Sequence, residues 1–143
     1  MSHPIDPRRL GVELLSEARH AIDTLVGRIS PTAQHPAMTI AIMSLRRVAT
    51  AEAHPSIILP AAENVACEAD HAWWSDTARQ TFRSAAALAY LCQIMMACEG
   101  SMHHDNPAIA AWARAEIRYG ASMALSPAVT IPHLRYRHRQ IAG

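Results

Sequence analysis

The chain has 143 residues, of which half are hydrophobic and 17% are charged. This length fits one domain, and the composition excludes a disordered chain. Five glycines are too few for a phosphate-cradling loop or a turn-rich β-sandwich, and a formal net charge of +1 excludes a strongly basic nucleic-acid-binding protein and an acidic tail protein.

Five helices are expected from the periodicity of apolar residues and from capping residues and prolines. The first covers residues 7–29, with Asp6 as its N-cap. Its apolar stripe consists of Leu14, Leu15, Ala18, Ala21, Ile22, Leu25 and Ile29. The second covers residues 36–53, and His54-Pro55 ends it because the residue before a proline disfavours helical backbone. Its stripe consists of Met38, Ala41, Ile42, Leu45, Val48 and Ala49.

The third and fourth helices are predicted at residues 56–74 and 76–99. A proline inside a helix removes a hydrogen bond, so Pro60 is tolerated only if it lies in the first turn of the third helix. Ser75 or the aspartate after it is expected to cap the fourth helix, and Gly100 is its expected C-terminal stop.

The fifth helix is expected to start at Asn106-Pro107 and to end before Ser126-Pro127. All the connections are short, and nothing alternates as a strand does, except within the C-terminal tail. Because short connections favour antiparallel neighbours, we predict an all-α, single-domain bundle over residues 1–126.

The fourth helix is apolar on nearly all sides from Ala85 to Cys98. We expect it to be the central helix, or to complete its burial in an oligomer. The stretch is too short to cross a bilayer, and the N-terminal sequence MSHPIDPRRL lacks the apolar region of a signal peptide. The expectation is therefore a cytoplasmic protein with no membrane contact.

Three cysteines, Cys67, Cys92 and Cys98, form an odd set without a CxxC pair, so no disulfide framework is expected. Cys92 shares a predicted face with apolar residues and should be buried and inert. Cys67 lies on a polar face and should react first with a thiol reagent.

The polar face of the third helix is the first candidate site. It carries Glu63, Cys67, Asp70, His71 and Trp74. A solvated acidic face explains the charges, but a tryptophan among them is typical of an interaction hot spot. Glu63, Asp70 and Trp74 are therefore the candidate interaction residues of the bundle.

A metal site is the alternative interpretation of this face. Cys67 and His71 are four residues apart, and thiolate, imidazole and carboxylate suit zinc or iron; the same pair also suits a thiolate activated by histidine. A second set, suited to copper or zinc, consists of Cys92, Met96, Glu99, His103, His104 and Asp105. The second set also has a structural explanation, because methionine and cysteine commonly fill hydrophobic cores and the histidines lie in an expected polar loop. The candidate ligands are Cys67, His71, Glu99, His103 and His104.

Evidence for an enzyme is weak. Glu-x-x-His occurs at residues 17–20 and 68–71, but the first pair lies off its apolar stripe, so the ligands of a di-iron site cannot converge. Glu99 and Glu116 fall on apolar sides of their helices, where bridges to arginine are expected rather than a catalytic acid pair. No nucleophile elbow, P-loop or dinucleotide fingerprint is present, so an enzyme is the less favoured interpretation.

The C-terminal sequence forms a basic arm over residues 127–143. Its candidate interaction residues are Arg135, Tyr136, Arg137 and Arg139. Residues 48–78 hold five acidic residues and no arginine, so we predict that the arm docks on this segment, within the chain or across a dimer. The alternatives are nucleic-acid binding through phosphate contacts and Tyr136 stacking, and a frayed end.

These observations predict a non-enzymatic helical module for protein–protein interaction or regulation, with an extended basic C-terminal arm. We expect it to pair with itself as a homodimer or with another protein, and to need no cofactor. The alternative functions are a metal-binding helical bundle and a small nucleic-acid-binding accessory protein that uses the arginine-rich tail.

Overall fold

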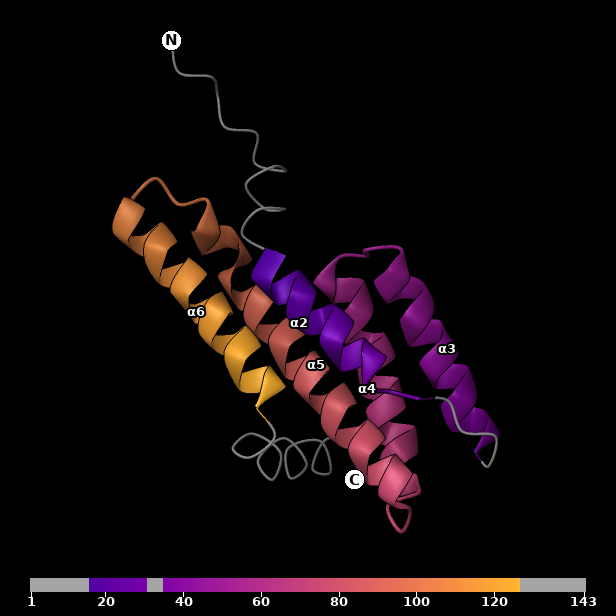
Figure 1. Cartoon of the computed structure of the whole chain (residues 1–143). Helices are drawn as coiled ribbons and strands as arrows, with labels where there is room; N and C mark the ends of the chain where they lie inside the picture. Colours follow the sequence, from indigo (N-terminus) through magenta and orange to yellow (C-terminus); the bar gives the residue numbers. More distant parts are fainter. Residues whose placement is uncertain (1–15, 31–34, 127–143) are drawn as a thin grey trace.

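The computed structural model describes residues 16–30 and 35–126 as a bundle of helices, with no strand among these residues (Figure 1). The described helices are α2 (Ser16–Gly27), α3 (Pro36–Thr50), α4 (Pro55–His71), α5 (Asp76–Met102) and α6 (Pro107–Leu125). The predicted all-α class is confirmed. The arm at residues 127–143 and the helix start at Asp6 lie outside the described residues.

Four helices, α3, α4, α5 and α6, lie side by side in chain order, and α2 lies across this row in contact with α6, α5 and α3 (Figure 1). Short connections join neighbours in the row, which makes them antiparallel. The 27-residue helix α5 lies between α4 and α6 and beneath α2. It is the central helix, as predicted.

One hydrophobic cluster draws side chains from all five described helices, and nearly half of its members are alanines. Small side chains let helix backbones approach closely, so the α5–α6 contact is tight: a Cβ added at Gly120 would meet Ile94. The largest fully buried side chain is Phe82, whose ring packs edge to face on Trp73 with centroids 5.3 Å apart.

Helix α5 is long and apolar enough to cross a membrane by length and composition alone, although the apolar run from Ala85 to Cys98 was expected to be too short. In its most apolar 18-residue window, 56% is buried inside the bundle. Core helices of bundles meet the same criteria, because they too are apolar on most sides. The length and composition of α5 therefore do not indicate by themselves that it spans a membrane.

The predicted starts of the second to fifth helices are confirmed to within a residue. Pro36, Pro55 and Pro107 open α3, α4 and α6, where a missing backbone N–H costs nothing. The Ser75 hydroxyl accepts a hydrogen bond from the Ala78 N–H at the start of α5, and the Asn106 side chain does the same for α6.

Several predicted helix ends were wrong. Gly100 does not stop α5, which continues to Met102, because no described glycine adopts the left-handed backbone of a helix stop. Helix α4 ends at His71, so Trp74 lies in the following turn. Pro60 is the sixth residue of α4 rather than part of its first turn. It lies on an exposed position, where water can satisfy the carbonyl that loses its N–H partner.

Helix α3 ends at Thr50, three residues before the predicted end, in a Schellman motif. The Ala53 N–H donates to the Val48 carbonyl at 3.0 Å, and the Glu52 N–H donates to the Ala49 carbonyl at 3.1 Å. Glu52 takes the left-handed backbone at φ 54°, which glycine normally occupies, and it is the only non-glycine with positive φ among the described residues.

Candidate functional site

The outer side of α3 carries two large apolar side chains that face solvent. Ile40 is 67% exposed and Met43 is 57% exposed. They are three residues apart and share one face of the helix. Helix α3 is the outermost helix of the row and packs on α4 and α2, which leaves this face without a neighbour among the described helices (Figure 1).

Trp74 lies at the N-terminal end of this helix and is 73% exposed. Its indole ring packs on the imidazole of His35, the N-cap residue of α3, with centroids 6.0 Å apart and planes at 66°. This edge-to-face contact orients the indole while leaving most of its surface in water. We call Ile40, Met43 and Trp74 the α3 surface.

A shallow, open depression lies at the C-terminal end of α3. It is lined by Met43, Arg46, Arg47, Thr50 and Ala51. The Arg46 guanidinium donates to the Ile29 carbonyl after α2 at 2.5 Å, whereas Arg47 is exposed beside the depression. Guanidinium groups stack well on aromatic rings, so this is a suitable receptor for an aromatic side chain.

The other predicted interaction residues of the bundle are less exposed than Trp74. Glu63 and Asp70 are half-buried on one flank of α4, together with Cys67. Asp70 makes an interaction within the molecule. The remaining predicted interaction residues, Arg135, Tyr136, Arg137 and Arg139, lie outside the described residues.

The candidate metal ligands are not gathered into one place. Within residues 16–30 and 35–126, no group of three or more His, Cys, Asp or Glu side chains is arranged to hold a metal ion. His103 and His104 are exposed after the end of α5, and His104 Nδ1 accepts a hydrogen bond from the Asn106 N–H at 3.0 Å. Cys67 and His71 lie on α4, with His71 exposed in its last turn.

Glu99 contradicts its prediction, because it is exposed and pairs with a histidine rather than with an arginine. Its Oε1 lies 2.8 Å from His54 Nε2, and His54 Nδ1 lies 2.8 Å from the Ser56 hydroxyl. His54 Nδ1 also accepts from the Ser56 N–H at 3.1 Å, so this imidazole caps α4. His54 thus caps the start of α4 and also links it to Glu99 of α5 through a hydrogen bond. Glu116 is half-buried.

The thiols differ in environment. Burial raises the pKa of Cys92 to about 12. Burial also raises the pKa of Cys67, and the neighbouring carboxylates of Glu68 and Asp70 raise it further. Both shifts disfavour the thiolate, which is opposite to the direction needed for a cysteine activated by His71.

We expect iodoacetamide to modify Cys67 before Cys92 in the folded protein, because Cys67 is half-buried and Cys92 is fully buried. The Cys67 rate should rise steeply above about pH 8, since its raised pKa delays formation of the reactive thiolate. Peptide mass spectrometry at a series of pH values measures both rates. Faster labelling of Cys92 under native conditions would contradict the assigned helix faces.

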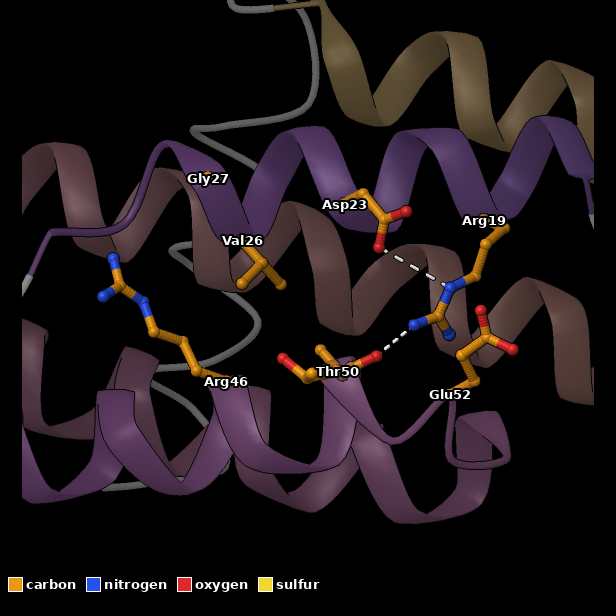
Figure 2. Close-up of a pocket in the computed structure, with 8 residues that line it drawn as sticks. Arg19, Asp23, Val26, Gly27, Arg46, Thr50 and Glu52 are labelled. Carbon is orange, nitrogen blue, oxygen red and sulfur yellow. Dashed lines mark hydrogen bonds and ion pairs between the residues drawn. The ribbon is translucent and has the colours of Figure 1, made fainter.

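A second hollow region lies between α2 and the end of α3 (Figure 2). Arg19 lies at one end of it, where its guanidinium donates to the Ala49 carbonyl and its Nε lies 3.5 Å from Asp23 Oδ1. The Glu52 side chain lies next to this guanidinium (Figure 2). The same three side chains also line an adjoining cavity of about 610 Å³ that extends to Met95 of α5.

Sequence reasoning missed several of these residues. Ile40 and Met43 are large apolar residues that lie outside the main apolar stripe of their helix. This position in the sequence pattern could have indicated that they are exposed. Trp112 and Tyr119 on α6 are 56% and 61% exposed and were not singled out either. The left-handed backbone of Glu52 has no signal in the sequence, because glycine or asparagine is the usual residue there.

Compared with known proteins, the chain matches no family model, no curated protein and no solved structure.

Proposed function

We propose that the protein is a helical interaction module that pairs with a second copy of itself along α3. The observation that carries this proposal is that α3 exposes Ile40 and Met43 along its length, with the exposed Trp74 at its N-terminal end and an open depression at its C-terminal end. Exposed apolar side chains grouped on one face are typical of protein–protein contact sites.

A two-fold axis near the middle of α3 makes this surface self-complementary. It sets the two α3 helices antiparallel, so that the N-terminal end of each lies against the C-terminal end of the other. Helix α3 has 15 residues and is roughly 22 Å long. Each Trp74 is then directed at the depression beside Met43 of the other copy.

The chemistry of the two ends fits this arrangement. Arg47 is exposed beside the depression and supplies a guanidinium group that stacks on an indole. Ile40 and Met43 lie between the ends and bury apolar surface against their counterparts, and the flexible methionine adapts to the packing. A buried tryptophan in a pocket is a frequent hot spot of a protein interface.

Sedimentation equilibrium over a range of protein concentrations tests this proposal. We expect the unmodified chain to be dimeric at micromolar concentration and Trp74→Ala to dissociate it. The loss should be about 2 kcal/mol or more per dimer, which is roughly thirtyfold or more in Kd. Far-UV circular dichroism should be unchanged, because Trp74 lies in a turn and is mostly exposed.

The matched control is Trp112→Ala, which removes another exposed tryptophan, 56% against 73% for Trp74, from α6 on the other side of the bundle. It should leave Kd unchanged. A monomeric unmodified chain at high concentration would contradict the proposal. So would a dimer that Trp112→Ala disrupts and Trp74→Ala does not, because the contact would then involve α6.

A further inference from the structure

Glu52 combines an unfavourable backbone with a position at the wall of two cavities. Glu52 has left-handed backbone, with φ at 54°. This conformation costs a residue that carries a Cβ roughly 1–2 kcal/mol relative to glycine. The Schellman motif needs only glycine there, so nothing in the local hydrogen bonding calls for a carboxylate. Strained residues of this kind cluster at ligand sites, where the side chain is what is needed.

The cavity of about 610 Å³ lies within the size range of small-molecule sites. Its apolar wall is made by Ile22 of α2, Met95 of α5, and Ala53 with Pro55 at the start of α4. The polar side of its lining includes Ser16, Arg19, His20, Asp23, Glu52 and His54. The cavity therefore combines an apolar wall with a carboxylate from Glu52.

The charges lining the cavity leave one carboxylate unmatched. Arg19 lies 3.5 Å from Asp23 Oδ1 and donates to the Ala49 carbonyl, so its charge is already balanced (Figure 2). Glu52 makes no ion pair or hydrogen bond through its side chain among the described residues, although it lies beside Arg19. An anionic ligand would have to displace Asp23 from Arg19, whereas a cationic ligand can bind the Glu52 carboxylate on the side away from Arg19.

We propose that this cavity binds a small organic amine, with its ammonium group on the Glu52 carboxylate and its apolar body against Ile22 and Met95. This site is separate from the α3 surface, and its occupation does not depend on dimer formation. A hydrogen bond between an ammonium and a carboxylate adds to the burial of the apolar body, so the ligand must carry both parts.

Isothermal titration calorimetry with three probes of one chain length tests the chemistry. Hexylamine should bind at least about tenfold more tightly than hexanol, because only the amine forms a charge-assisted hydrogen bond with Glu52. Hexanoate should bind most weakly, since its charge is repelled by the same carboxylate. Equal binding of hexylamine and hexanol, or no detectable binding of hexylamine, would overturn the proposal.

Two substitutions at Glu52 separate ligand binding from folding. Glu52→Gln keeps the size of the side chain and removes the charge, and it should reduce hexylamine affinity to that of hexanol. Glu52→Gly should reduce the affinity equally while raising the urea midpoint, because glycine relieves the left-handed backbone. Glu116→Gln, at a half-buried acid of α6 away from the cavity, should leave binding unchanged. Undiminished hexylamine binding by Glu52→Gln would show that the carboxylate is not the anchor.

Discussion

Replacing Phe82 by alanine is expected to lower the free energy of unfolding by about 3–5 kcal/mol. Phe82 is fully buried on the central helix α5, and its ring packs edge to face on Trp73 at 5.3 Å. The substitution removes the transfer free energy of the ring and the aromatic contact, and it leaves a cavity that the neighbouring helices fill only in part. Because domains are stable by only about 5–15 kcal/mol, this is a large fraction of the total.

Urea denaturation followed by circular dichroism measures this loss. Tyr119→Ala is the control, because it truncates an aromatic side chain that is 61% exposed on α6. It should change the free energy of unfolding by no more than about 0.5 kcal/mol. Similar losses for both variants would contradict the assignment of Phe82 to the core.

Replacing Gly120 by alanine is expected to destabilise the protein by about 1 kcal/mol, although alanine is the better helix former. A Cβ at this position of α6 would lie 2.7 Å from Ile94 Cδ1 and 3.3 Å from Ile94 Cγ2. Because the closest atom is the end of a half-buried side chain, Ile94 must change its rotamer while the helices stay in place. Thermal and urea unfolding measure the loss.

Two further substitutions test the cause of this loss: Gly100→Ala is the control, and Ile94→Val should compensate for Gly120→Ala. Gly100 of α5 has nothing within 4 Å of an added Cβ, so Gly100→Ala should stabilise the protein by up to about 1 kcal/mol. Ile94→Val removes the Cδ1 atom that causes the closest contact. In a double-mutant cycle it should recover part of the loss from Gly120→Ala. A loss that is simply additive would show that Ile94 is not the cause.

The α3 surface is where sequence reasoning and tertiary structure diverge most. Trp74 was predicted on the polar face of the third helix and is exposed, but it lies in the turn after α4, and its predicted neighbours Glu63 and Asp70 are half-buried. Its actual neighbour is His35, which lies 39 positions away in the chain. A helical wheel assigns angles around one helix and carries no information on which helix packs beside it.

The buried sides of α2 and α3 were determined by the sequence itself, because the preferences involved are local. Ala18, Ile22 and Leu25 were predicted to lie on the apolar stripe of the first helix and are buried, and Cys92 of α5 is buried as predicted. Helix starts followed from prolines and from side-chain caps such as Ser75, which act within a few residues of the chain.

Only the tertiary structure decided which residues from different helices meet. The contacts of His54 with Glu99 and of Ile94 with Gly120 join residues far apart in the chain, and no spacing rule relates them. The same holds for helix ends: Gly100 lies inside α5, whereas Glu52 takes the left-handed backbone that the sequence would assign to a glycine. Packing free energy summed over a bundle exceeds the roughly 1 kcal/mol by which a single residue favours one backbone region, so the tertiary contacts prevail.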